Sequence, residues 1–165
     1  MKRILCTLLA LILLLPGCVL GENAPQDPVT FYYLRDEVSY GAADGVITAE
    51  SVDAAGHTGD LDYLLALYLA GPLSDHLRNP FPKDVKLTGV TADSDVLTVT
   101  LKGSFGSMED LAVTKACVCL AMTGFGMTDA GTVSLCLVDS KENTTQTVSI
   151  PRDSVILEDI IPETT

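Results

Sequence analysis

The chain has 165 residues, enough for one domain with a hydrophobic core, and 47% of them are hydrophobic, which does not indicate disorder. Its formal net charge of -12 argues against a basic surface for nucleic-acid phosphates or anionic lipid head groups. We therefore expect no nucleic-acid partner and interpret the charge as a solvated acidic surface that keeps the domain soluble.

The first eighteen residues have the pattern of an export signal. Two basic residues precede an apolar run, Ile4 to Leu15, which has the length of a signal-peptide core and is too short for a permanent membrane span. Leu15-Pro16-Gly17-Cys18 then resembles a lipobox, the site where bacterial lipoproteins are lipidated on the cysteine and cleaved before it, although Pro16 is less usual there than a small residue. The alternative is an ordinary secretory signal with a nearby cysteine.

We expect residues 1–17 to be removed and Cys18 to carry the lipid. Its acyl chains, palmitate among them, would bury methylenes at about 0.8 kcal/mol each and hold the protein at the extracytoplasmic face of a bacterial cell membrane. Residues 18–28, with glycine and two prolines, are expected to form a short tether.

Two strands and a helix are expected next. Val29 to Leu34 is β-branched and aromatic, and Val46 to Val52 alternates weakly, so both segments favour strands. The helix has Asp60 as its expected N-cap and ends where Gly71 adopts a left-handed conformation and Pro72 cannot continue it. Its apolar face is made by Leu61, Leu64, Leu65, Tyr68 and Leu69.

A hairpin and a second helix follow a proline-rich corner. The strands 85–91 and 96–101 flank a short polar turn at 92–95. Ser107 and Asp110 have the spacing of a capping box, which predicts a helix that starts at Met108. Gly124 and Gly126 are expected to end it.

This second helix is apolar on most of its circumference. Either the first helix and one sheet bury it within the chain, or a second molecule covers the outer side. The candidate interface residues are Ala112, Val113, Ala116, Cys117 and Leu120.

The last elements are a strand at 132–138, a polar loop at 140–146 and edge strands at 147–150 and 155–157 around Pro151. This order predicts an α+β fold, a two-layer sandwich with a small, mostly antiparallel or mixed sheet and two helices on one face.

The corner carries a resemblance to a known family. Leu-Ala-Gly-Pro at 69–72, then Asn79-Pro80-Phe81-Pro82 and the strand from Val85 resemble the GerMN domain of bacterial sporulation and spore-germination lipoproteins. In that family the corner leads into a hairpin, a second helix and a closing strand, an order found here over about 60–139. The resemblance implies a domain over 29–140, with a C-terminal extension at 141–165.

The residues indicate no catalytic site. His57 and His76 lie in no nucleophile motif or metal-ligand spacing, and the carboxylate pairs at 60/62 and 93/95 are explained by a helix start and a turn. The glycines at 124 and 126 lack the preceding strand that a phosphate-binding loop needs. We expect no enzyme activity, metal or cofactor.

Three cysteines of the domain leave two interpretations open. Cys117 and Cys119 point to different faces of a helix, so joint zinc ligation is poorly supported. With Cys136 they could form one disulfide, or all three could be small buried hydrophobic residues, which we favour.

The resemblance implies a non-enzymatic module for contact with an envelope protein or for self-association, in sporulation or germination, because GerMN domains look similar to ring-building domains of sporulation secretion machinery. The alternative is a lipoprotein that binds a wall-derived sugar or peptide, or that regulates a wall enzyme. A flat apolar patch would favour the first function, and a deep pocket with convergent polar groups the second.

The anchor can be tested directly. Cys18→Ser should release the protein from membranes or leave the precursor uncleaved, because the acylated thiol is lost. Fractionation with palmitate labelling measures this. A variant that stays membrane-bound with unchanged mobility, together with unlabelled wild type, would contradict the lipid anchor.

Overall fold

The computed structural model describes residues 27–35, 46–107, 109–139 and 145–155. The export signal, Cys18, most of the tether and the strand expected at 155–157, except Val155, lie outside the described residues. The elements in chain order are β1 Pro28–Arg35, β2 Val46–Asp53, α2 Leu61–Ala70, β3 Leu77–Arg78, β4 Lys86–Asp93, β5 Val96–Gly103, α3 Leu111–Met127, β6 Thr132–Asp139, β7 Thr145–Pro151 and the short 3-10 helix η1 Arg152–Ser154.

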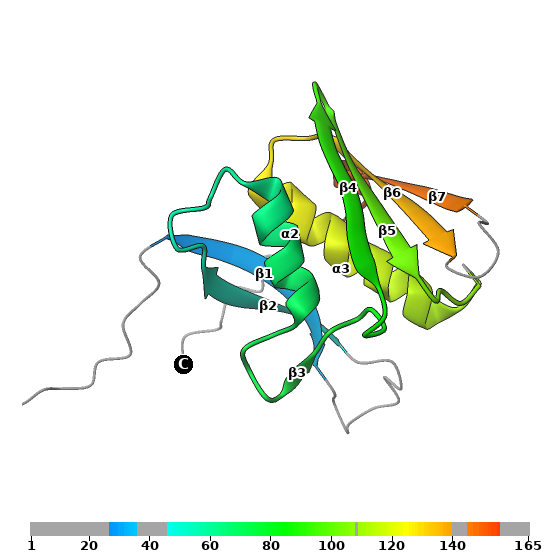
Figure 1. Cartoon of the computed structure of the whole chain (residues 1–165), viewed down its shortest axis with the longest axis horizontal. Helices are drawn as coiled ribbons and strands as arrows, with labels where there is room; N and C mark the ends of the chain where they lie inside the picture. Colours follow the sequence, from blue (N-terminus) through cyan, green and yellow to red (C-terminus); the bar gives the residue numbers. More distant parts are fainter. Residues whose placement is uncertain (1–26, 36–45, 108, 140–144, 156–165) are drawn as a thin grey trace, which may run out of the picture.

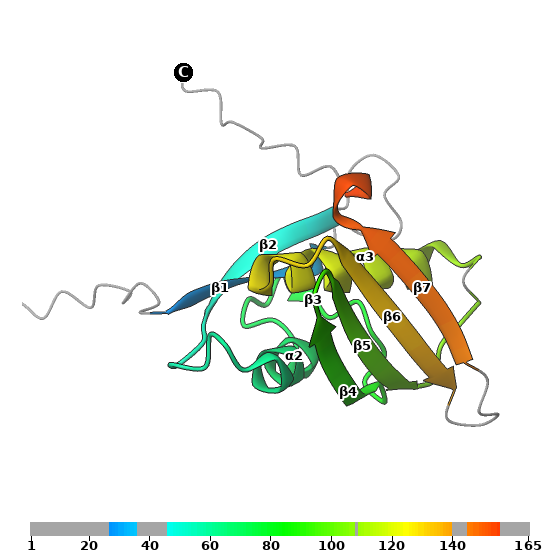
Figure 2. The same ribbon diagram turned by 90° about the horizontal axis from the view of Figure 1, so that it is seen from above.

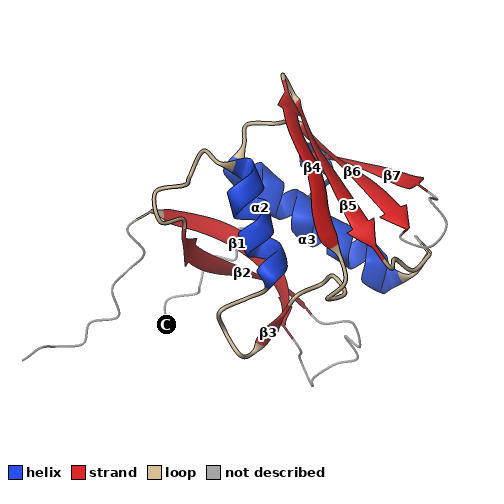
Figure 3. Cartoon of the chain, viewed as in Figure 1, coloured by secondary structure: helices blue, strands red, loops and turns tan. Residues whose placement is uncertain are grey.

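The strands form two sheets (Figures 1 and 3). One has the order β2-β1-β3 and is antiparallel. The other has the order β4-β5-β6-β7, in which β5 and β6 are parallel and are connected through α3. The α+β class and the mixed sheet are thus confirmed. The strands divide between two sheets where one was expected, because the β1/β2 hairpin pairs with β3 instead of joining β4.

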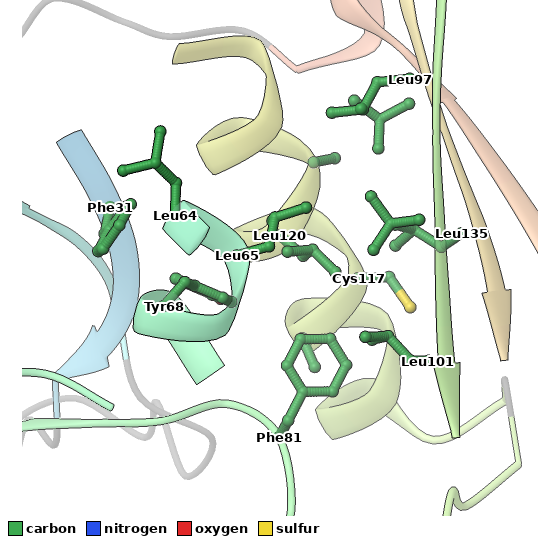
Figure 4. Packing of buried hydrophobic residues seen from close by; sticks show 14 of the residues in the cluster. Phe31, Leu64, Leu65, Tyr68, Phe81, Leu97, Leu101, Cys117, Leu120 and Leu135 are labelled. Carbon is green, nitrogen blue, oxygen red and sulfur yellow. The ribbon is translucent and has the colours of Figure 1, made fainter. Parts of the chain in front are cut away.

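Helix α3 lies between the two sheets, with the four-stranded sheet on one side and β1 on the other (Figure 2). Side chains from both sheets and from α2 and α3 make one hydrophobic core (Figure 4). The second sheet gives α3 the cover that one sheet could not. Its buried residues are Ala116, Cys117, Cys119, Leu120, Ala121, Thr123, Gly124 and Phe125.

Strand β1 is joined to both helices by hydrogen bonds along the edge that faces away from β2. The Tyr32 N–H donates to Thr123 Oγ1 at 3.0 Å, and the Tyr68 hydroxyl donates to the Tyr32 carbonyl at 3.1 Å. The Tyr33 hydroxyl donates to the Tyr68 carbonyl at 3.0 Å, and the two tyrosine rings stack at 5.0 Å. Burial raises the pKa of both tyrosines, so they stay neutral donors.

The boundaries of α2 follow from its sequence. The Asp60 side chain accepts a hydrogen bond from the Tyr63 N–H at 3.0 Å, which confirms the predicted N-cap. Gly71 has φ 108° and ψ 171°. The positive φ was predicted, but the ψ lies outside the left-handed helical region, in a conformation that only glycine adopts readily.

The predicted start of α3 is wrong, and its end, Met127, lies one residue beyond Gly126. Asp110 is its N-cap, accepting from the Ala112 N–H at 2.9 Å, whereas Ser107 accepts from the Glu109 N–H in the preceding turn. The helix therefore begins at Leu111 instead of Met108. At the other end it continues through Gly124, where a Cβ would lie 2.8 Å from Leu97 Cδ2. The glycine is needed for close packing on the sheet and does not end the helix.

The predicted hairpin is confirmed. Strands β4 and β5 pair antiparallel from Lys86 opposite Lys102 to Asp93 opposite Val96, with a bulge at Thr88. The turn contains two residues, Ser94 and Asp95, instead of the four expected at 92–95, and Ser94 has φ 49°. Strands β6 and β7 extend the sheet, which confirms an edge strand before Pro151.

The observed N-cap of α3 can be tested with two substitutions, one at Asp110 and one at Ser107. Asp110→Ala should lower the free energy of unfolding by about 1 kcal/mol, because the Ala112 N–H loses its acceptor and the helix dipole loses a favourable charge. Ser107→Ala should cost clearly less, since its acceptor lies in the turn before the helix. Urea unfolding monitored by circular dichroism measures both; equal losses would contradict the observed cap.

Candidate interaction surface

The corner between α2 and β4 is fastened to the first sheet by a buried carboxylate. Glu50, on β2, is 9% exposed. Its two oxygens accept from the Leu73 N–H at 3.1 Å, the Ser74 N–H at 2.9 Å and the Ser74 hydroxyl at 2.5 Å. With three hydrogen bonds to two successive residues, this one side chain fixes the start of the corner.

The Asn-Pro-Phe-Pro segment, residues 79–82, is held in place by hydrogen bonds of Asn79. Asn79 Nδ2 donates to the Leu69 carbonyl at 2.8 Å, and Asn79 Oδ1 accepts from the Phe81 N–H at 2.9 Å. The Phe81 ring is 5% exposed and packs into the core beneath the corner (Figure 4). The two flanking prolines, Pro80 and Pro82, stay at the surface. The motif predicted from the sequence therefore positions Phe81 and serves the fold.

A notch of about 200 Å³ lies between this corner and the start of α3. We call it the apolar notch. Asp110 is the ionisable residue in its lining, and Leu111, next in the chain, is 54% exposed. It is lined by Pro80, Phe81, Pro82, Phe105, Gly106, Asp110, Ala112, Val113 and Ala116.

The five candidate interface residues differ in how exposed they are. Ala112 is exposed and Val113 is half-buried, and both line the apolar notch. Ala116 lies at its floor and is 3% exposed. Cys117 and Leu120 are each 1% exposed, inside the core, so they cannot contact another molecule. The expected interface therefore shrinks to the first turn of α3.

The sequence did not point to Phe105, which forms one wall of the notch. Its signal was an aromatic residue isolated between Gly103 and Gly106 in a polar loop. Nor did the sequence indicate that the corner and the helix start converge, because 30 residues separate Pro82 from Ala112.

The carboxylates and histidines considered from the sequence have local roles. Asp95 accepts from the Gly131 N–H at 2.8 Å, which ties the β4/β5 turn to the loop before β6. His57 stacks on the Tyr63 ring at 4.1 Å, near the N-cap Asp60. Within the described ranges, no group of three or more His, Cys, Asp or Glu side chains could hold a metal ion.

The cysteines of the domain are free thiols. No disulfide is formed among them, and the interpretation as small buried hydrophobic residues is confirmed for Cys117 and Cys119 but not for Cys136, which is half-buried. Burial raises the pKa of Cys117 to about 11 and that of Cys119 to about 12. Neither thiol is a nucleophile near neutral pH.

Three chains among solved structures are similar to this one, and two of them are described here. One contains the tandem GerMN domains of the sporulation protein GerM from Bacillus subtilis, with 22% identity, 75% of this chain covered and a TM-score of 0.48. The match spans 45% of that structure's length. The other, described as "Putative Lipoprotein from Clostridium perfringens", has 14% identity, covers 77% of this chain and 89% of that one, and has a TM-score of 0.43.

The first of these structures belongs to the family that the corner resembles in sequence. No family model matches the chain, and no curated protein does. Among the described residues, no helix is both long and apolar enough to span a membrane.

Proposed function

We propose that this protein is a lipid-anchored extracytoplasmic lipoprotein that acts as a non-enzymatic protein-protein interaction module in the bacterial envelope. The observation that carries the proposal is the apolar notch beside the exposed Leu111. A role in sporulation or germination is proposed from the sequence resemblance of the corner to GerMN lipoproteins.

The notch suits a side chain of a partner protein better than a metabolite. Its volume of about 200 Å³ is below the roughly 300 to 1,000 Å³ of typical small-molecule pockets. One aliphatic or aromatic anchor would fill it, and such anchors supply most of the binding energy in many protein interfaces.

The walls of the notch are held in place before a partner arrives. Phe81 is positioned by Asn79, the corner is fastened to Glu50, and α3 begins at a capped residue, Asp110. A preformed site avoids part of the ordering cost of binding.

Charge around the notch would select the orientation of the partner. Glu109 and Asp110 are exposed beside it, and the chain carries a net charge of -12. A partner with basic residues around its apolar anchor would be attracted and aligned, while acidic surfaces would be rejected.

The alternative function rests on a second hollow, below the corner. It has a volume of about 580 Å³, and its lining mixes apolar groups with Ser74, Asp75, Asn79 and Lys83. These polar side chains could bind a wall-derived sugar or peptide by hydrogen bonds.

Site-directed crosslinking tests the proposed function in intact cells. A photo-crosslinking residue replaces Ala112, in the notch, or Ala66, which is exposed on α2 and serves as the matched control. The proposal expects one dominant adduct with an envelope protein at position 112 and none at position 66, identified by mass spectrometry. Ala112→Glu, which places charge in the notch, should reduce capture of that protein by wild-type bait at least tenfold.

Equal adduct patterns at the two positions would contradict a specific interface at the notch. Binding of wall fragments that is lost in Asn79→Ala but kept in Ala112→Glu would instead support the ligand-binding alternative. Asn79→Ala also removes two hydrogen bonds of the corner, so its folding is checked by circular dichroism.

A further inference from the structure

The outer face of the four-stranded sheet is not covered by any described element. Both helices lie on the other side of that sheet (Figure 2). Burial alternates along β5 and β6, with Leu97, Val99 and Leu101 of β5 directed to the core. The intervening residues, such as Thr98 and Thr100, therefore form the outer face.

The register places the side chains of this face in cross-strand rows. One row is Thr91, Thr98, Ser134 and Ser149, and the next is Gly89, Thr100, Cys136 and Thr147. These eight central positions carry no charge, although the chain has 22 acidic residues. The centre of the face thus carries short, uncharged side chains in a strongly acidic protein, and a hollow of about 470 Å³ lies at the end with Lys86 and Lys102.

Charged residues stand at opposite ends of the same face. Lys86 and Lys102 lie directly opposite each other at one end, and Asp93 lies at the other end of β4. Two like charges directly opposite in an antiparallel pair are unfavourable. Within the described residues neither lysine makes an ion pair. Asp84 lines the same hollow as the two lysines, and an acidic group of a second molecule would add to its favourable effect on them.

The two central strands of the sheet, β5 and β6, are parallel. Here the inner face is covered by α3 and the outer face is open. Val96, 38% exposed at the edge of the outer face, adds apolar surface to it.

We propose that this face binds the same face of a second copy of the chain. The two-fold axis lies between the four-stranded sheets of the two copies and runs perpendicular to their strands. It places each end of one sheet over the opposite end of the other. Lys86 of each copy then meets Asp93 of its partner, twice by symmetry, and the hydroxyl rows stack between them. An axis parallel to the strands would set β4 over β7, with Lys86 over Thr145 and Asp93 over Pro151, so charge selects the first arrangement.

The size of the face predicts weak association. Strands of eight residues at about 3.3 Å per residue, four of them about 4.8 Å apart, give about 500 Å² per copy. The total of about 1,000 Å² is at the lower limit of specific interfaces. Anchoring at the membrane would raise the effective concentration and favour the dimer. The inference goes beyond the proposed function, because it concerns a face away from the notch.

Charge reversal tests the symmetric contact. The chain 18–165 with Cys18→Ser is studied by sedimentation equilibrium. Lys86→Glu or Asp93→Lys should each weaken self-association about tenfold or more, because each places like charges together twice. The double variant should self-associate with a constant within about threefold of the wild-type value, since the charges of the Lys86–Asp93 pair are only exchanged. High salt should weaken the wild-type dimer.

Lys83→Glu is the matched control, since it makes the same charge change at an exposed residue off this face and should leave association unchanged. Ala112→Glu should also have no effect, which separates this inference from the notch. A chain that stays monomeric at its highest soluble concentration would overturn the proposal. So would association that the double exchange does not restore, or association that appears only when residues 156–165 are removed, which would make that segment the occupant.

Discussion

The hydrogen bond from the Tyr32 N–H to Thr123 Oγ1 joins the first sheet to α3, and the rest of the structure depends on that junction. A helix that is apolar on most of its circumference needs cover on both sides. The four-stranded sheet covers one side and β1 lies on the other, where Phe31 and Tyr33 also pack against Tyr68 of α2. A buried aromatic side chain stabilises by about 1.5 to 3 kcal/mol and a hydrogen bond by about 1 kcal/mol, so burial supplies most of the energy and the hydrogen bond fixes the register.

The corner and the notch depend on the same junction. Strand β2 is held only through β1 in its sheet, and β2 carries the Glu50 carboxylate that fastens the corner. The corner in turn sets Phe81 against α3. The surface proposed to bind a partner is therefore a consequence of packing in the core, and changes far from the notch can alter it.

Local features of the sequence predicted local structure correctly. Asp60 and Gly71 set the ends of α2 by backbone chemistry, and the polar residues around Ser94 marked the hairpin turn. Residues whose type fits two different local structures were misassigned. Ser107 and Asp110 are both good N-caps, and Gly124 reads as a helix end although it serves a close contact with Leu97.

What the sequence could not predict is non-local. The pairing of β1 with β3, and hence a second sheet, brings together residues more than 40 positions apart. Without that sheet the apolar circumference of α3 predicted an intermolecular interface as readily as a core. The notch combines two segments that were each identified, but their convergence depends on the tertiary fold.

Thiol reactivity tests most directly whether α3 is buried between two sheets. The chain 18–165 with Cys18→Ser is treated with a thiol reagent near pH 8 in dilute solution, and mass spectrometry assigns the modified residues. Cys117 and Cys119 should react only through global unfolding, at rates that follow denaturant stability, because both are buried and their pKa values are raised to about 11 and about 12. Cys136, half-buried on the outer sheet face, should react faster in the native protein. Modification of Cys117 or Cys119 as fast as that of Cys136 without denaturant would show that α3 is not buried between the two sheets and would contradict the account.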